Sequence, residues 1–547
     1  MDKKRDLFVR DASGLVREVS TLNALAFNIS AETGGAGSVA INYMVFAAPA
    51  VMLFGLPAHG WGAIILGLFC VVYCLIFVAL TSAMPRTGGD YVYSSRIMHP
   101  FLGWIEAWTF LWSLLPLVGF CAWQGIFGIY VQAATNAVIY PNSVWTSIAA
   151  AMQPQLNMLI ISTIALVIIS IMVTLPTRTY HKILTAGSLL CMTALGIMLF
   201  ASFFADPNIF AANFQKYTGQ STEQVIQSAI ANGWHRGEFN LGTLGPLLAF
   251  MMLLFIGFVY SAFMAGELKG NVQRNTVIAS LGAVLWIVCI QAFFLLPWVR
   301  IAGLDTIYAW SYLYWNGYSA PLGAPAYANS LLQLAMPQLS APLTVLGILV
   351  GGVFCLLLVP VWATTSIRMF FAFAMDRMTP KRWAKVDERT HSPIYLNIIV
   401  MVISWFMLYE TIYGVSPINT SWFTVCCSVL VWIFPGLNAV LIPYRRKDLY
   451  ELVPATWKKN IAGVPIIVVL GVIWLAFAVP IYVAEFMLPM ATQIISGGAA
   501  VLTSVTGGIS MTIAVVVVGI VWYFVAYNYN KRKGVDVSLL YRTIPPE

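Results

Sequence analysis

The chain of 547 residues is 60% apolar and only 9% charged. Soluble domains are about 45–50% apolar and about 25% charged, so a soluble fold of this composition could not cover its surface with polar groups. The composition indicates an integral membrane protein and excludes collagen, coiled coil, disorder and nucleic-acid binding. The formal net charge of +8 is expected to lie mostly in loops on one side of the membrane, where it sets the orientation.

A membrane-spanning helix needs about 20 apolar residues, because the hydrocarbon core is about 30 Å thick. The first twenty residues are polar and contain no apolar core before a cleavage site, so we expect no removable signal peptide. The later runs are apolar on all sides, unlike the alternating strands of a membrane barrel, and predict helices. Twelve such spans are expected, over 21–54, 60–84, 102–132, 156–175, 183–204, 241–265, 276–299, 341–372, 393–414, 422–443, 462–490 and 509–528.

The basic residues support this span count. With twelve spans, every Lys and Arg except Lys216, Arg236 and Arg300 falls on the side of the membrane that holds the N-terminus. Basic residues concentrate in cytoplasmic loops, so both termini are predicted to be cytoplasmic. The eight cysteines lie in apolar runs without a C-x-x-C pair, which favours core residues over disulfides or zinc ligands.

The first span is interrupted by polar residues and glycines. Glu32 to Gly37 lie roughly 17–25 Å along it, near mid-depth of the bilayer. We expect two half-helices here, whose free N–H groups would attract a carboxylate and whose free carbonyls would attract an ammonium or metal cation. The alternative is that Gly34, Gly35 and Gly37 allow close helix packing. Glu32 favours the break, because a carboxyl at mid-depth costs about 2.5–3.5 kcal/mol on insertion scales and must face a partner or water.

The sixth span carries a weaker signal of the same kind. Gly257 lies among aromatic residues in the segment 253–261. Spans 1 and 6 each open a set of five spans, and interrupted helices at matching positions indicate an inverted-repeat transporter with its site at the midplane.

Short motifs support a resemblance to a known family. Pro85–Tyr93 resembles the pattern P-x-[ST]-G-G-x-Y-x-[YF], and Pro100–Trp104 continues it. Ala265–Arg274 is similar to A-G-E-x-K-N-P-x-R, and Arg368–Pro380 to R-x-x-x-A-x-A-x-D-G-x-x-P. Together with Gly34–Gly37 in place of a G-[SA]-G motif, these segments resemble the amino acid/polyamine/organocation permeases. The Glu32-Thr33 flank, Gly270-Asn271-Val272 and Asp376-Arg377 depart from the family patterns and indicate an outlying branch of amino acid permeases.

The resemblance implies an all-α polytopic membrane protein of the LeuT type. Two inverted five-helix repeats (about 21–204 and 241–443) and two peripheral helices (about 462–528) would form one transmembrane domain over 21–530. Residues 1–20 and 531–547 would be cytoplasmic segments. Helices 1 and 6 would be discontinuous, and alternating access would move an amino acid or related amine across the cell membrane.

The resemblance also implies the substrate site. Backbone N–H groups of span 1 would hold the substrate carboxylate, span 6 carbonyls would receive the amine, and span 6 aromatics would shape the pocket or its gate. For the aromatics, ordinary core or lipid packing is the alternative. The substrate-binding candidates are Thr33, Gly34, Gly35, Ala36, Gly37, Phe255, Ile256, Gly257, Phe258 and Tyr260.

Glu32 could bind a cationic substrate, carry a coupling proton, ligate sodium or cap the second half-helix. Thr364 and Thr365 in span 8 are further candidates for a coupling ion, although hydroxyls in membrane helices usually bond to their own backbone. No cofactor, resident metal or catalytic group is expected. An exchanger of amino acids and polyamines remains an alternative to a gradient-driven transporter, and a passive channel or a membrane-embedded enzyme is less favoured.

Charged residues at the predicted cytoplasmic ends of the spans could form an inner gate of ion pairs, or could serve only orientation and helix ends. They are Arg86, Asp90, Glu267, Arg274, Arg368 and Asp376. Glu106 lies about a turn inside span 3, from which its side chain can extend to the interface, and the five histidines are expected outside the spans.

Overall fold

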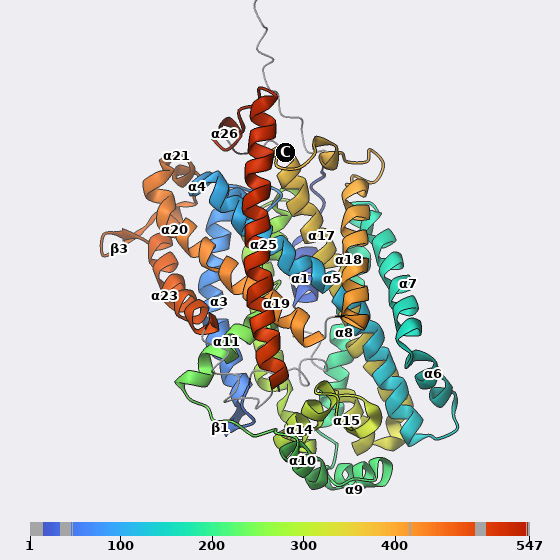
Figure 1. Cartoon of the computed structure of the whole chain (residues 1–547). Helices are drawn as coiled ribbons and strands as arrows, with labels where there is room; N and C mark the ends of the chain where they lie inside the picture. Colours follow the sequence, from blue (N-terminus) through green and yellow to red (C-terminus); the bar gives the residue numbers. More distant parts are fainter. Residues whose placement is uncertain are drawn as a thin grey trace, which may run out of the picture.

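The computed structural model describes residues 15–32, 45, 48–414, 417–486, 499–542 and 544. Within these ranges the chain is a bundle of helices (Figure 1), and the strands are confined to two short antiparallel hairpins. Strand β1 (Met52–Leu53) pairs with β2 (Leu56–Pro57), and β3 (Asn460–Ile461) pairs with β4 (Val464–Pro465). The predicted all-α membrane fold is confirmed.

Ten helical segments of the described chain are long and apolar enough to cross a membrane, and they match the expected spans 2–5 and 7–12. They are Ala58–Ala83 (α3), Pro100–Ile139 (α5), Gln155–Thr174 (α7), Thr177–Ser202 (α8), Val272–Ala302, Pro337–Met375, Ile394–Tyr413 (α18), Thr420–Arg445, Ile466–Val483 and Thr506–Arg532.

Several of these segments combine consecutive helices or belong to longer ones. The parts are α12 (Val272–Cys289), a π-helical turn (Ile290–Phe294), α13 (Leu296–Ala302), α16 (Ser340–Gly347), a second π-helical turn (Ile348–Val353), α17 (Phe354–Met375), α19 (Pro417–Val431), α20 (Ile433–Arg445), α23 (Ile466–Phe486) and α25 (Ala499–Arg532).

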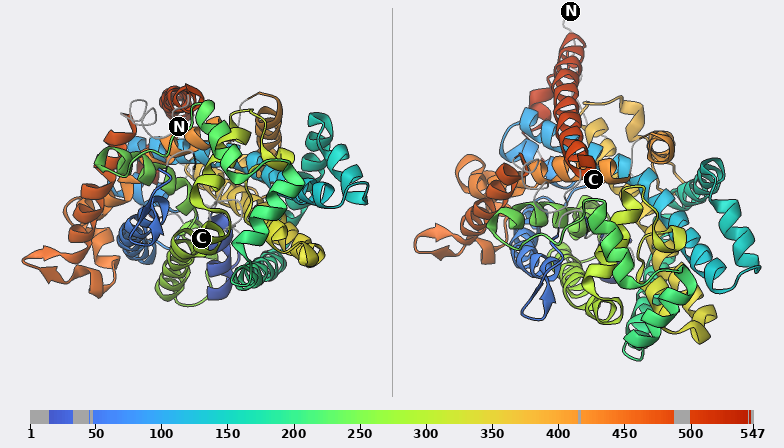
Figure 2. Two further views of the ribbon diagram at one scale, coloured as in Figure 1. Left: turned by 90° about the horizontal axis from the view of Figure 1, so that it is seen from below. Right: turned by 60° about the horizontal axis from the view of Figure 1, so that its bottom comes forward.

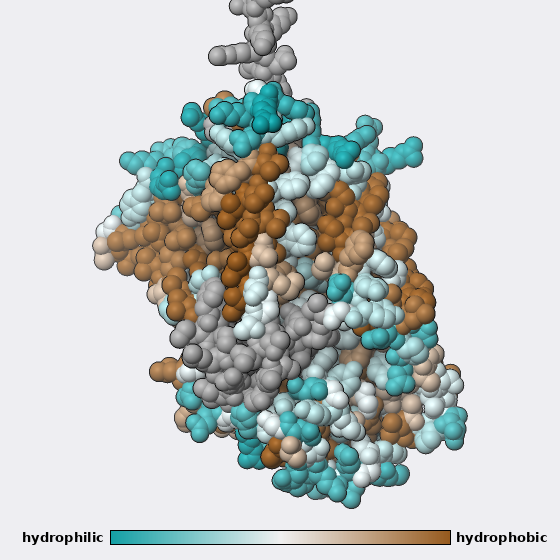
Figure 3. Space-filling model, viewed as in Figure 1, coloured by the Kyte–Doolittle hydropathy of each residue, from teal (hydrophilic) through white to brown (hydrophobic). Residues whose placement is uncertain are grey.

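The bundle presents an apolar belt to its surroundings. Ile164, Ile168 and Ile171 of α7 and Val521 and Val525 of α25 are all more than half exposed. In Figure 3 brown apolar side chains occupy the middle of the molecule, and teal polar side chains cover both ends. Exposed aliphatic residues at this density suit contact with lipid chains.

One end of the bundle, which we call the basic face, carries Arg96, Arg377, Arg446 and Lys533. In Figure 1 it is the upper end, where the C-terminal helix lies beside the ends of several spans. Its short elements are α4 (Asp90–Ile97), α21 (Lys447–Leu452), α22 (Ala455–Lys458), the 3₁₀ turn Lys381–Ala384 and α26 (Val537–Leu540).

The opposite end is covered by short helices from the long loops between the spans. They are α6 (Val144–Met152), α9 (Pro207–Thr218), α10 (Thr222–Ala231), α14 (Leu304–Trp315) and α15 (Ala328–Ala335), with the 3₁₀ turns Pro321–Gly323 and Pro337–Leu339. Figure 2 shows these helices from below, between the β3–β4 hairpin at one edge and α6 and α7 at the other.

Helix α5 crosses the bundle diagonally (Figure 1) and packs against α17, α18 and α19. Small residues permit this crossing: a Cβ on Gly128 would come within 2.0 Å of the Gly351 carbonyl oxygen. Seven of the expected core cysteines are buried free thiols, and Cys289 is exposed, so the expectation of a core position was wrong for that residue.

Candidate functional site

The first described helix is too short to cross a membrane. Helix α1 (Thr21–Ala31) has 11 residues, which is about 16 Å of helix. It begins where the Ser20 hydroxyl accepts a hydrogen bond from the Asn23 N–H, and it ends at Glu32, whose backbone is extended (φ −79°, ψ 112°). The predicted first half-helix therefore ends at Glu32, where the predicted break begins. The predicted substrate residues Thr33, Gly34, Gly35, Ala36 and Gly37 lie outside the described residues.

The predicted break in span 6 is confirmed. Helix α11 (Leu241–Phe255) ends at Ile256, and Gly257 follows with φ +116°, a conformation that favours glycine. The chain then makes 3₁₀ turns over Tyr260–Phe263 and Ala265–Glu267 before α12 begins. Backbone without α-helical hydrogen bonds needs other partners inside a membrane protein.

The two helix ends meet, and Asn28 joins them. Its side-chain amide donates to the Phe258 carbonyl oxygen at 2.7 Å, and its Oδ1 accepts from the Ser261 N–H at 2.8 Å. Gly257 lies directly against Ala31, and the Trp362 Nε1 of α17 donates to the Ala31 carbonyl oxygen at 2.8 Å. Two backbone groups released by the span 6 break are thus bonded to the Asn28 side chain of α1, and one carbonyl at the end of α1 is bonded to α17.

The aromatic candidates of span 6 are buried, but they face different neighbours. The Phe258 ring packs 5.5 Å from Tyr73 and 5.6 Å from Trp432, within an aromatic part of the core. The Tyr260 ring lies 5.7 Å from Phe110 of α5, and its hydroxyl has no hydrogen-bond partner within the described chain. The structure therefore places Tyr260 beside α5, and Phe258 in the core against α3 and against Trp432, which lies between α19 and α20.

Glu32 closes α1 and is almost fully buried, with 1% of its surface exposed. Neither carboxylate oxygen has a hydrogen-bond partner among the described residues. Its carboxyl lies close enough to the Cys70 and Cys74 thiols of α3 for an electrostatic effect. A buried carboxylate without donors is costly, so a bound proton or a nearby cation would stabilise this group.

The hydroxyl candidates of span 8 lie in α17, a helix that packs against α1. Thr364 donates to the Tyr180 hydroxyl at 3.1 Å, and Tyr180 in turn donates to the Pro360 carbonyl oxygen at 3.1 Å. Thr365 donates to the Val361 carbonyl oxygen at 2.9 Å. Both hydroxyl protons are thus engaged in hydrogen bonds, so a cation beside these residues would bind the lone pairs of their oxygens.

Two of the predicted gate residues pair with each other. Arg368 donates through two nitrogens to the two carboxylate oxygens of Glu267, at 2.6 and 2.9 Å, and both side chains are buried. Planar two-bond pairing of this kind fixes both side chains in one orientation. Just before α1, the Val19 N–H donates to the Glu267 carbonyl oxygen at 3.0 Å, so the chain entering α1 lies against the segment that follows the span 6 break.

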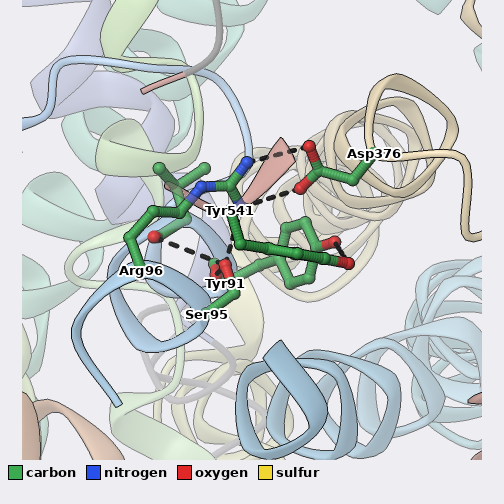
Figure 4. Close-up of polar contacts among 6 residues, drawn as sticks. Tyr91, Ser95, Arg96, Asp376 and Tyr541 are labelled. Carbon is green, nitrogen blue, oxygen red and sulfur yellow. Dashed lines mark hydrogen bonds and ion pairs between the residues drawn. The ribbon is translucent and has the colours of Figure 1, made fainter. Parts of the chain in front are cut away.

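A second buried pair joins Asp376 to Arg96, which the sequence did not suggest as a gate residue. The guanidinium contacts the two carboxylate oxygens at 2.7 and 2.8 Å. The Tyr541 ring lies 5.0 Å from the Arg96 guanidinium carbon, and its hydroxyl is 3.2 Å from that of Tyr91. Figure 4 shows Arg96 facing Asp376, with Tyr91 and Tyr541 alongside. The predicted cytoplasmic tail is therefore packed into this cluster.

The other charged candidates lie in different environments. Arg274 is exposed, and Arg86 donates to its neighbour Pro85. Asp90 is buried and caps the Tyr91 N–H at 3.0 Å, and burial raises its pKa. Glu106 is 1% exposed and interacts with Asp90, so its side chain does not extend to the interface.

Two histidines were also placed incorrectly: His59 lies in the first turn of α3 and is 1% exposed, and the second is His181. His181 lies inside α8 and is 1% exposed, and its ring is 5.9 Å from that of Phe27 in α1. The expectation that all histidines lie outside the spans was therefore wrong. The sequence around His181 did not predict its burial, because Phe27, which packs against it, belongs to α1 and is distant in the chain.

The segment Thr87-Gly88-Gly89, within the Pro85–Tyr93 motif, contacts two other parts of the bundle. A Cβ on Gly88 would come within 2.6 Å of the Ala372 Cβ, and one on Gly89 would come within 2.8 Å of the Phe263 ring. The Gly88 N–H also donates to the Phe263 carbonyl oxygen at 3.0 Å. Both glycines have positive φ, so the motif is a tight contact between the segment after the span 6 break and α17.

Comparison with protein-family models gives a match over residues 19–509 to the model described as amino acid permease. A comparison with curated proteins gives no match. The family match runs from the end of the N-terminal segment into α25, and so includes both helix breaks and both buried ion pairs. The chain belongs to the amino acid permease family.

Proposed function

We propose that this protein is a secondary active transporter that moves amino acids or related amines by alternating access. The observation that carries the proposal is the meeting of two interrupted helices inside the bundle, where Asn28 of α1 bonds backbone groups of the segment that follows α11. Such an arrangement provides N–H groups for a carboxylate and carbonyl oxygens for an amine. Membership of the amino acid permease family supports the same substrate class.

The proposed substrate site combines the span 1 residues Thr33 to Gly37 with the span 6 segment from Phe255 to Tyr260. Gly257 brings the span 6 backbone against α1, and Tyr260 would be the aromatic residue that lines the site. Phe258 would act indirectly, by holding the break against the core. Coupling is assigned to Glu32 as a proton or cation site, with Thr364 and Thr365 as oxygen donors on the neighbouring helix.

The orientation belongs to the same proposal. The basic face would be cytoplasmic, because positive residues concentrate there, and the chain would lie in the cell membrane as one domain over 21–530. Two inverted repeats and two peripheral helices would account for the twelve spans. The buried pairs Arg368–Glu267 and Arg96–Asp376 would then close the cytoplasmic side of the substrate site.

The direct test is counterflow in liposomes. Purified protein is reconstituted with unlabelled amino acid inside, and uptake of the labelled compound is measured with and without proton and sodium gradients. A transporter accumulates label transiently by exchange, whereas a channel does not, and gradient dependence separates coupled uptake from exchange. Candidate substrates are selected beforehand by thermal stabilisation, because a ligand stabilises the state that it binds. Absence of counterflow with every stabilising compound would contradict the proposal.

A Gly35→Leu variant adds a test of the span 1 site. It is expected to insert and fold but to lose counterflow, because the side chain would occupy the space proposed for the substrate carboxylate. Normal counterflow by this variant would remove span 1 from the site.

A further inference from the structure

A cavity of about 490 Å³ opens on the basic face, between the loop after α17 and the last turns of α25. Four basic residues line it, and no carboxylate is among its lining residues: Arg377, Lys381, Arg382 and Lys533. The cavity is far in sequence from the two helix breaks, and the proposed transport function does not use it.

The walls of the cavity are held together by hydrogen bonds. Asn530 of α25 donates to the Arg377 carbonyl oxygen at 2.8 Å, and Trp522 Nε1 donates to the Met378 carbonyl oxygen at 2.9 Å. Both acceptors belong to the loop that carries the basic side chains. The concentration of positive charge is therefore built into a fixed junction between two elements.

The other side of the cavity is apolar and continues along the outside of the bundle. Trp522 and Val525 line the cavity, and Val518, Val521 and Val525 of α25 are 53%, 57% and 61% exposed. In Figure 3 this part of α25 is brown directly below the teal upper end of the molecule. A ligand in the cavity would thus meet cations at one end and a lipid-facing apolar helix at the other.

We propose that this cavity binds an anionic phospholipid. Its phosphate would lie among Arg377, Lys381, Arg382 and Lys533, and an acyl chain would follow Val525 and Val521 along α25. Basic pockets at the membrane surface favour anionic headgroups through charge, and the apolar wall distinguishes a lipid from a free phosphate ion. Binding of this lipid stands independently of the transport proposal.

The position of the site suggests what the lipid does. Arg377 directly follows Asp376, whose carboxylate is paired with the buried Arg96. A headgroup that holds the 377–382 loop against α25 would stabilise the loop conformation in which this pair is formed. The lipid would thereby favour closure of the basic face.

The test is lipid retention by the purified full-length chain, measured by native mass spectrometry. Phosphatidylglycerol and phosphatidylcholine are titrated separately, and inorganic phosphate is added as a competitor. The triple variant Lys381→Gln, Arg382→Gln and Lys533→Gln is compared with a matched variant, Arg445→Gln, Lys447→Gln and Lys459→Gln. The matched variant removes the same charge from the basic face, at positions that do not line the cavity.

The wild type is expected to retain one phosphatidylglycerol in preference to phosphatidylcholine. The cavity variant should weaken this binding by at least about tenfold, from the loss of three nearby cations, and the matched variant by less than about twofold. Equal loss in both variants would reduce the effect to general surface charge and would overturn the proposal. Complete displacement by inorganic phosphate would overturn it as well, since the cavity would then be a free anion site. Should the triple variant fail to fold, Lys533→Gln alone is measured against Lys459→Gln by the same criteria.

Discussion

Gly257 lies so close to Ala31 that a Cβ built on Gly257 would come within 2.3 Å of the Ala31 Cβ. The contact joins the end of the α1 half-helix to the break after α11, and φ +116° at Gly257 keeps the chain in a conformation that other residues rarely adopt. The geometry of the proposed site thus depends on the absence of one side chain.

The first prediction concerns Gly257→Ala. The new methyl group must displace α1 and also occupies an unfavourable backbone region, so we expect a loss of more than about 2 kcal/mol in the free energy of unfolding. Counterflow should be abolished, because the two half-helices can no longer approach. Thermal unfolding in detergent and counterflow in liposomes measure the two effects.

Gly270→Ala is the matched control. Gly270 also has positive φ (+78°), but no atom lies within 4 Å of its Cβ position. This variant should lose only about 1–2 kcal/mol from backbone strain and should keep counterflow. If both variants lost transport equally, the contact with Ala31 would have no special role.

The second prediction concerns Asn28. Asn28→Ala leaves the Phe258 carbonyl and the Ser261 N–H without their partner, and each buried group without a partner costs about 1–3 kcal/mol. Asn28→Asp keeps the acceptor for Ser261 but loses the donor to Phe258. Both variants should therefore be less stable and lose most of their transport, and Asn28→Ala should be affected more.

Asn23→Ala provides the comparison on the same helix. Asn23 accepts one hydrogen bond from the Thr185 hydroxyl at 3.1 Å and is only partly buried. Its replacement should cost about 1 kcal/mol or less. A larger transport defect in Asn23→Ala than in Asn28→Ala would contradict the role given to Asn28.

Hydropathy and glycine placement predicted the span arrangement because both depend on local sequence. A run of about 20 apolar residues must span the bilayer or be covered, and Gly257 among aromatics marked the point where α11 ends. Gly88 and Gly89, which have positive φ and lie against Ala372 and Phe263, are further positions of this local kind. Backbone constraints of this kind can be recognised from single residues in the sequence.

Partners of the polar residues could not be predicted in the same way. Arg96 and Tyr541 are separated by most of the chain, and no periodicity connects a short loop helix with a C-terminal segment. Glu106 lies near an end of its span, where extension to the interface is the usual outcome, but Asp90 and the neighbouring helices cover it. The pairing of charged residues on the basic face depends on packing between spans. Hydropathy contains no information about this packing.

The third prediction concerns the Glu267–Arg368 pair. Glu267→Gln leaves a buried guanidinium without its carboxylate, which should cost about 3–5 kcal/mol. Removing both charges in Glu267→Gln with Arg368→Met should cost less than the single change, because no buried charge remains unpaired. A double-mutant cycle on thermal stability measures the coupling. Additive effects of the two single variants would show that the pair contributes nothing beyond its separate side chains.

The fourth prediction concerns Tyr541, which is 4% exposed. Tyr541→Phe removes only the hydroxyl contact with Tyr91 and should cost about 1 kcal/mol. Tyr541→Ala also removes the ring beside Arg96 and should cost about 3 kcal/mol. Leu539→Ala is a suitable control, because Leu539 is 53% exposed on the same short segment. Equal stability of the Phe and Ala variants would mean that the C-terminal segment does not hold the Arg96–Asp376 cluster.

The fifth prediction concerns Glu32. Both carboxylate oxygens are buried without hydrogen-bond donors in the described chain. Burial disfavours the charged form of Glu32, and a bound proton or cation would stabilise the group. Glu32→Gln should make uptake independent of the gradient that drives it while counterflow persists, since an amide keeps the shape but can neither release a proton nor neutralise a cation. Glu106→Gln changes another buried carboxyl, on α5, and should keep the gradient dependence. The two variants are compared at acidic and neutral pH, with sodium or potassium outside. Gradient dependence that is lost in Glu106→Gln but retained in Glu32→Gln would move the coupling site from α1 to the Asp90–Glu106 pair.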